Sequence, residues 1–109
     1  MRIKIAVTLC LLLLVSAFAF ANVPEMTVEQ IVASGYDHQI VSVTGVITEQ
    51  VRHEKFIFQD DTGTMLIEID EEDWPRYNTP LYNQKLNIIC EVEREHKSIK
   101  LEAKRINVL

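Results

Sequence analysis

The stretch from Phe56 to Ile69 reads FIFQDDTGTMLIEI, and its pattern decides the fold. Apolar and polar residues alternate on both sides of Asp60-Asp61-Thr62-Gly63, a run of turn-forming residue types. The apolar positions on this alternating phase are Phe56, Phe58, Met65, Ile67 and Ile69. The pattern predicts a β-hairpin with one buried face, and we expect Gly63 to adopt a positive φ angle in the turn.

Three further strands are predicted around this hairpin. Residues 40–51 form a long β-branched stretch with Gly45 inside it, which indicates a bulge or a sharp coil. Residues 86–92 alternate again, and Cys90 lies on their apolar phase, so we expect a buried thiol that packs as a small hydrophobe. In residues 99–108 the apolar phase changes near Lys104-Arg105, which implies a bulge there or departure from the sheet.

A short helix is predicted ahead of the strands. Thr27 and Gln30 have the spacing of a capping box, in which each side chain satisfies a free backbone N–H group. Met26 and Ile31 occupy the apolar positions on either side of this cap. Gly35 follows, and we expect it to end the helix in the left-handed conformation.

These elements have the order of an OB-fold (Greek-key) barrel. Residues 70–83, between the third and fourth strands, break the two-residue period and predict a helical turn followed by a loop. We therefore predict a mainly β protein, a five-stranded OB-fold barrel with a short N-terminal helix. From the pattern alone, an SH3-like barrel or a small β-sandwich stays open.

The first 21 residues are predicted to be a secretory signal peptide. Arg2 and Lys4 precede an apolar run, and Ala19-Phe20-Ala21 has the small-x-small pattern of a cleavage site. An uncleaved N-terminal anchor is the alternative. Cleavage leaves residues 22–109 as a single domain in the periplasm, with one cysteine and therefore no intramolecular disulfide.

The mature chain is acidic. Because Arg2 and Lys4 leave with the signal peptide and no acidic residue does, nine of the 11 basic residues remain against 16 acidic ones, a formal charge of −7. Such a chain repels phosphate backbones, so general nucleic-acid binding is disfavoured.

The pattern Val41-x-Val43-x-Gly45-x-Ile47, followed by Phe56-x-Phe58-x-Asp60-x-Thr62-Gly63-x-Met65-x-Ile67-x-Ile69, resembles the bacterial OB-fold (BOF) family of the YgiW/YdeI type. The resemblance covers the whole mature chain. It implies a five-stranded barrel with a helix beside it, and a small periplasmic protein without established enzymatic activity. It also implies a role in tolerance of stresses such as peroxide, acid, metals or cationic peptides. The chain departs from the family at residues 71–77, where members often have a shorter, glycine-containing stretch.

Acidic and aromatic residues gather after the third strand. Carboxylates in this number could hold a divalent cation or attract a cationic peptide, and a solvated acidic loop is the alternative. The neighbouring aromatic rings, with Tyr82, could stack on a ligand or cap the open end of the barrel. A second acidic pair lies in the turn at the opposite end of the hairpin. The candidate ligand-binding residues are Glu71, Glu72, Asp73, Trp74, Tyr77, Asp60 and Asp61.

Catalytic, metal and cofactor sites are not predicted. His38, His53 and His96 fall in three separate turns, whereas a transition-metal site needs converging ligands. No serine lies in a nucleophile motif. With Phe56 and Phe58 pointing inward, the outer face of the second and third strands lacks the aromatic platform and positive charge that bind single-stranded nucleic acid.

The sequence therefore predicts a non-enzymatic periplasmic OB-fold binding module that supports envelope stress tolerance. Its partner would be a small ligand, a cationic peptide or an envelope protein, with no nucleic acid and no stable membrane insertion after signal cleavage. The alternative is a cation- or metal-binding protein that uses the acidic loop after the third strand.

Overall fold

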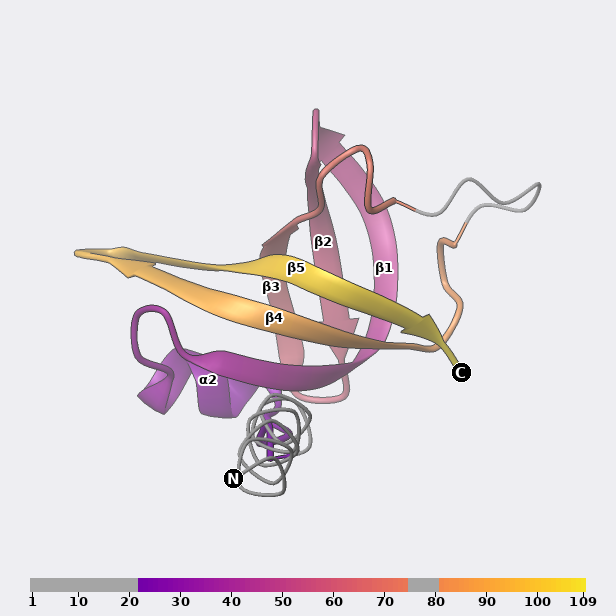
Figure 1. Ribbon diagram of the computed structural model, residues 1–109. Helices are drawn as coiled ribbons and strands as arrows, with labels where there is room; N and C mark the ends of the chain where they lie inside the picture. The colour runs from indigo at the N-terminus through magenta and orange to yellow at the C-terminus, as the bar shows by residue number, and fades with distance from the viewer. Residues whose placement is uncertain (1–21, 75–80) are drawn as a thin grey trace, which may run out of the picture.

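The described part of the chain folds as a closed β-barrel with one short helix (Figure 1). The structure, a computed structural model, describes residues 22–74 and 81–109. The elements are α2 (Val28–Ser34), β1 (Ile40–Arg52), β2 (Lys55–Asp60), β3 (Gly63–Glu68), β4 (Leu86–Glu95) and β5 (Ser98–Val108). The predicted OB-fold architecture is thus confirmed. None of the described helices is long and apolar enough to span a membrane.

The strand order around the barrel is β1-β2-β3-β5-β4. All neighbours pair antiparallel except β3 and β5, whose parallel pairing closes the barrel. One end holds the β2–β3 turn and α2, and the other holds the β1–β2 turn and the segment that leaves β3 (Figure 1). The two acidic groups of the sequence therefore lie at opposite ends of the barrel.

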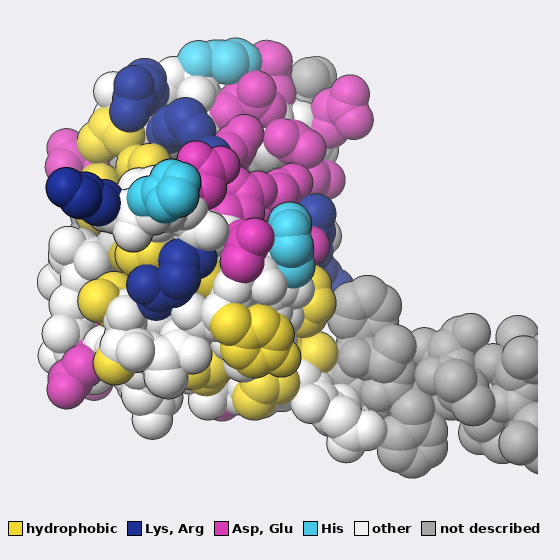
Figure 2. Space-filling model, turned by 90° about the vertical axis from the view of Figure 1, so that its left-hand side faces the viewer, with side chains coloured by type: hydrophobic (Ala, Val, Ile, Leu, Met, Phe, Trp, Pro, Cys, Tyr) yellow, Lys and Arg dark blue, Asp and Glu magenta, His cyan; other side chains and the backbone are white. Residues whose placement is uncertain are grey.

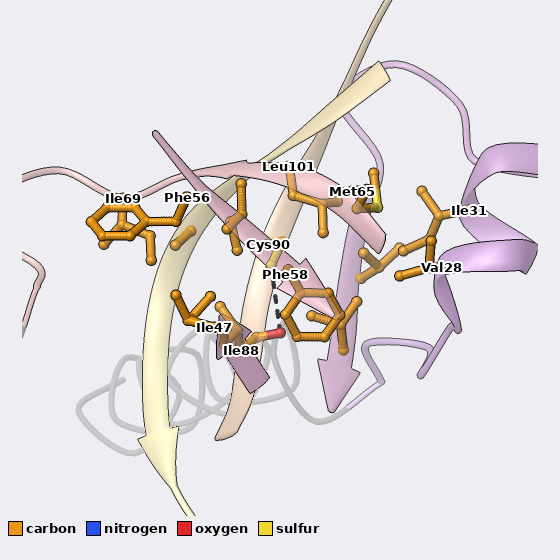
Figure 3. Packing of buried hydrophobic residues seen from close by; sticks show 14 of the residues in the cluster. Val28, Ile31, Ile47, Phe56, Phe58, Met65, Ile69, Ile88, Cys90 and Leu101 are labelled. Carbon is orange, nitrogen blue, oxygen red and sulfur yellow. Dashed lines mark hydrogen bonds between the residues drawn. The ribbon is translucent and has the colours of Figure 1, made fainter. Parts of the chain in front are cut away.

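The barrel interior is apolar, and among the described residues it contains no buried polar or charged side chain. Phe58 fills its middle, with Phe56 and Ile69 toward one end and Val28 of α2 toward the other (Figure 3). Cys90 is buried as predicted, and its Sγ atom lies 3.6 Å from the carbonyl oxygen of Ile88. Burial raises the pKa of the Cys90 thiol, so it is a packing group and not a reactive one.

The phase change in the last strand is a bulge. Ala103 pairs with Cys90 and Arg105 pairs with Ile89, which leaves Lys104 as one extra residue on β5. The strand stays in the sheet, and the bulge turns Ile106 toward the core, where it packs as a partly buried residue.

The helix begins as predicted and ends differently. The Thr27–Gln30 capping box is present, with the Gln30 N–H donating to the Thr27 hydroxyl at 3.2 Å. The left-handed stop predicted at Gly35 is wrong, because Gly35 is extended with φ −62°. Instead the Arg94 guanidinium donates to the carbonyl oxygens of Ile31, Val32 and Gly35 at the helix end. This side chain satisfies the acceptors that a left-handed cap would otherwise serve.

The positive φ predicted at Gly63 is also wrong, since no described glycine has one. The turn is closed by the Asp60 carboxylate, whose Oδ1 atom accepts from the backbone N–H groups of Thr62 at 2.8 Å and Gly63 at 3.2 Å. A turn built on an aspartate side chain in this way leaves Gly63 free to be an ordinary strand residue.

The β1 and β2 backbones lie so close together at residue 45 that only glycine fits there. It is the last residue of β1 that pairs with β4, and Val46 is the first that pairs with β2. A Cβ atom at Gly45 would lie 2.7 Å from the ring of Phe58 and would clash with the carbonyl oxygen of Gln59. The absent side chain therefore lets β1 coil closely over β2 while it passes from one partner strand to the other.

We expect Gly45→Ala to destabilise the protein by roughly 1–3 kcal/mol, because the β1 and β2 backbones must separate to admit the methyl group. Urea unfolding of the mature domain measures this loss. Gly63→Ala is the matched control, since its Cβ atom would meet only Val28 at 3.5 Å. A change of less than about 0.5 kcal/mol is expected for that control. Equal stability of the two variants would contradict the close approach at Gly45.

Candidate functional site

The segment after β3 turns back over the end of the barrel. The carbonyl oxygen of Asp70 accepts hydrogen bonds from the N–H groups of Asp73 at 2.8 Å and Trp74 at 3.0 Å, which makes the helical turn predicted there. This turn brings Trp74 over Phe56 of β2, with ring centroids 4.5 Å apart and an interplanar angle of 9°. Acidic side chains are carried around the outside of the same turn.

Trp74 contacts two other aromatic rings. Tyr82 lies on the chain that returns to β4, and its ring is 5.5 Å from that of Trp74 at 46°. Tyr82 forms a bridge with Ile47 of β1, and the N–H of Asn83 donates to the Ile47 carbonyl oxygen at 2.9 Å. Trp74 and Tyr82 therefore cap this end of the barrel, one of the two roles expected for them. Tyr77 lies outside the described residues.

Glu54 joins the β1–β2 turn to the acidic segment. It has φ 60°, an uncommon conformation for a residue with a side chain. Its carbonyl oxygen accepts from the N–H of Ile69, and its Oε2 atom accepts from the N–H of Glu71, both at 2.9 Å. The second carboxylate oxygen lies 3.4 Å from Nε2 of His53. Glu54 thus fixes where the acidic segment begins.

A hollow of about 250 Å³ lies between this turn and the aromatic cap. Its lining combines apolar and aromatic side chains with carboxylates and two other polar side chains. Its lining residues are Gln50, His53, Glu54, Phe56, Ile69, Glu71, Trp74 and Tyr82. The hollow is smaller than the ~300–1,000 Å³ of most small-molecule sites, so it suits a group the size of one side chain.

Next to this hollow is a wholly acidic depression. Its lining residues are Glu54, Asp70, Glu71 and Glu72. Burial raises the pKa of Asp70, and the nearby charges of Glu54 and Asp73 raise it further. Among the described residues, no cation pairs with any acid from Asp70 to Asp73. The acids from Asp70 to Asp73 therefore concentrate negative charge with which no described cation forms an ion pair.

Acidic side chains also occupy the outer face of β4 and β5, but basic residues accompany them. Figure 2 shows Asp and Glu side chains gathered in one broad patch with Lys and Arg side chains beside it. Nζ of Lys100 lies 2.8 Å from Glu68 and 3.3 Å from Glu93, and Lys104 lies 3.3 Å from Glu102. A hydrogen bond that the protonated Glu93 carboxyl donates to the Glu102 carboxylate raises the pKa of Glu93. These carboxylates, unlike those after β3, already have partners.

Comparison with known proteins identifies the family. The model of the bacterial OB fold (BOF) protein family matches residues 15–108. This chain belongs to the bacterial OB fold family. It matches no curated protein.

Solved structures agree with this membership. The E. coli hypothetical protein YgiW is 26% identical, with a TM-score of 0.71 over 78% of this chain and 89% of YgiW. A chain of the Replication Protein A heterotrimer bound to ssDNA is 11% identical, with a TM-score of 0.63 over 81% of both chains. A chain of the S. pombe Stn1–Ten1 complex is 14% identical, with a TM-score of 0.62 over 80% of this chain and 76% of that one. The last two likenesses concern the fold alone.

OB folds bind ligands on the face of β2 and β3 and with the β1–β2 and β4–β5 loops. In this BOF protein each of these loops has two residues, His53–Glu54 and His96–Lys97. Lys55 is the one basic residue on the described outer face of β2 and β3, and its Nζ atom lies 3.3 Å from Glu68. In the described residues, both loops are therefore short, and the basic residue on this face is already paired with Glu68.

The other candidate acids, Asp60 and Asp61, do not join the acidic segment. They line a separate hollow beside α2. The Oδ2 atom of Asp60 accepts from the N–H of Val28 at 2.9 Å, so it caps the helix across the fold. Partial burial acts to raise the pKa of Asp60, but hydrogen bonds from Thr62, Val28 and Gly63 outweigh this and lower it. Its carboxylate is thus fully engaged in structure.

Sequence reasoning missed Glu54 and Phe56 as parts of the site. The signal for Glu54 was the short connection after the strand predicted at residues 40–51, because tight hairpins often place a residue at positive φ. In a three-stranded meander the first turn lies beside the end of the third strand. That topology places Glu54 next to Asp70 and Glu71.

We expect Asp60→Ala to destabilise the protein by about 1–2 kcal/mol, because α2 and the β2–β3 turn lose the same acceptor. Thermal unfolding of the mature domain measures the loss. Asp61→Ala is the matched control, because Asp61 is an exposed neighbour in the same turn. If both variants lost the same stability, the capping role of Asp60 would be refuted.

Proposed function

We propose that this BOF protein is a non-enzymatic periplasmic binding module that supports envelope stress tolerance by capturing a basic partner. The partner class is a cationic peptide or a basic segment of an envelope protein. The periplasmic location rests on the signal peptide predicted at residues 1–21. The binding role rests on membership of a family with a binding fold.

The observation that carries the proposal is the negative charge of Glu71, Glu72 and Asp73, with which none of residues 22–74 and 81–109 forms an ion pair. Like charges this close repel one another and cost folding stability, unless solvent or a counter-charge lies against them. The carboxylates on β4 and β5 have lysine partners, whereas the described environment of this segment supplies none. A basic partner would supply the missing counter-charge.

The serine side chains support a non-enzymatic role. The Ser34 hydroxyl donates to the carbonyl oxygen of Gln30 at 2.9 Å, and the Ser42 hydroxyl accepts from the Asn87 amide at 2.7 Å. Neither hydroxyl has a histidine or a carboxylate as its hydrogen-bond partner in these contacts. A serine nucleophile needs such a base for activation.

Cation binding by the acidic segment is the alternative, and the geometry favours it less. In residues 22–74 and 81–109, one group of three carboxylates brings its oxygens within 4.8 Å of one another, Glu91, Glu93 and Glu102. This group lies on β4 and β5, away from the segment after β3. Lys100 and Lys104 already balance part of its charge. Calcium binding therefore serves as the competing outcome in the test below.

We expect the triple variant Glu71→Gln/Glu72→Gln/Asp73→Asn to keep or slightly raise stability and to capture a basic partner more slowly. The probe is a short arginine-rich peptide, and stopped-flow mixing measures the association rate. At ~10 mM salt, where the Debye length is about 30 Å, we expect a loss of roughly tenfold in this rate. The difference should shrink as salt is added, because the attraction acts at long range.

Three results bear on this prediction directly. Full binding by the triple variant at low salt would contradict the proposal. A large loss of stability would show instead that the acids hold the segment in place. Saturable calcium binding by the wild-type domain, abolished in the triple variant, would favour the cation-binding alternative.

A further inference from the structure

We infer that the hollow between Glu54, Glu71 and Trp74 is a pocket for one arginine side chain of the basic partner. This inference rests on the proposed function, because it names the group by which that partner is recognised. It adds a single defined contact to the general attraction between acidic and basic residues. The occupant is a guanidinium group together with its alkyl stem.

The walls of the hollow provide two kinds of surface. Phe56 and Ile69 are buried core residues, and Trp74 and Tyr82 are half-buried rings beside them. Such a surface suits the three methylene groups of an arginine stem, which bury readily against apolar atoms while the charged group stays at a polar edge. A guanidinium also stacks on aromatic rings more readily than an ammonium group does.

The polar part of the lining includes two acidic residues, Glu54 and Glu71. The hydrogen bond from the Glu71 N–H to the Glu54 carboxylate ties the two residues together at 2.9 Å. Among residues 22–74 and 81–109, no hydrogen-bond or ion-pair partner of the Glu71 carboxylate is found. A guanidinium has five N–H donors in a fixed planar arrangement and can reach two acceptors at once. An ammonium group lacks this planar arrangement.

The size of the hollow agrees with one side chain. Its volume of about 250 Å³ is too small for most whole ligands and is open at an edge from which a peptide could continue. The neighbouring depression, lined by Glu54, Asp70, Glu71 and Glu72, would then face the rest of the basic peptide. Short-range recognition and long-range attraction would thus act at adjacent sites.

Two neighbouring glutamates give a matched pair of variants. Glu71 lines the hollow, whereas Glu72 lines only the acidic depression. Glu71→Gln and Glu72→Gln remove the same charge from adjacent residues, so a long-range field changes almost equally in both. Trp74 is the one tryptophan of the chain, and its fluorescence reports on the hollow without a label.

The experiment titrates the mature domain with a peptide that contains one arginine and no aromatic residue. Peptides with citrulline or lysine in place of that arginine serve as comparisons. We expect the arginine peptide to change the Trp74 emission, and the citrulline peptide to bind about tenfold more weakly, because it lacks the charge. At ~150 mM salt we expect about a tenfold loss of affinity for Glu71→Gln, against a loss of about threefold for Glu72→Gln, which removes only the longer-range attraction.

The outcomes separate this inference from the proposed function. If no basic peptide bound even at low salt, the proposed function would fall and the pocket with it. If peptides bound but both variants weakened equally and Trp74 emission did not change, the basic-partner function would stand and the pocket would be overturned. Equal binding of the arginine and lysine peptides would overturn the guanidinium assignment.

Discussion

The close approach of β1 to β2 at Gly45 is the constraint on which the rest of the barrel depends. One strand pairs with β4 up to Gly45 and with β2 from Val46 onward, so a single chain segment joins both halves of the sheet. The coil of β1 over β2 encloses Phe58 and lets the parallel β3–β5 contact close the barrel. It also sets the path of β1 to its final turn, and therefore the position of Glu54.

The end of the barrel that carries Glu54 combines packing with a binding surface. Phe56 is a core residue, yet it supports the Trp74 ring that also lines the hollow. The acids that follow β3 are displayed on a turn that is anchored at both sides, by Glu54 at its start and by Trp74 at its finish. A rigid base under charged side chains lowers the entropy that a partner must overcome on binding. The opposite end is different, because its aspartate is engaged with α2.

The alternation of residue types predicted the strands well, because one buried face forces a period of two. The same reasoning located the bulge at Lys104, where the apolar phase changes. The capping box of α2 was also predicted correctly, because its two partners are only three residues apart and form a local pattern.

Contacts between distant parts of the chain could not be predicted from the sequence. Gly35 was expected to be left-handed, but Arg94, 59 positions away in sequence, satisfies the carbonyl oxygens at the helix end. Gly63 was also expected to be left-handed, but the side chain of Asp60, three residues earlier, closes that turn. The hydrogen bond between Asp60 and Val28 spans 32 positions in sequence, and no local sequence pattern predicts it. The candidate site shows the same difference between local and long-range features. The acids from Glu71 to Asp73 are consecutive and were found in the sequence, whereas Glu54 lies beside them only because of the strand topology.

Mapping of amide chemical shifts during titration with an arginine-rich peptide tests most directly whether function resides at this end of the barrel. The largest shifts should fall on Glu54, Glu71 and Trp74, with the outer face of β2 and β3 and the turn around Asp60 unchanged. Shifts centred on that face, or on the Glu91, Glu93 and Glu102 group, would contradict a basic-partner site beside the aromatic cap.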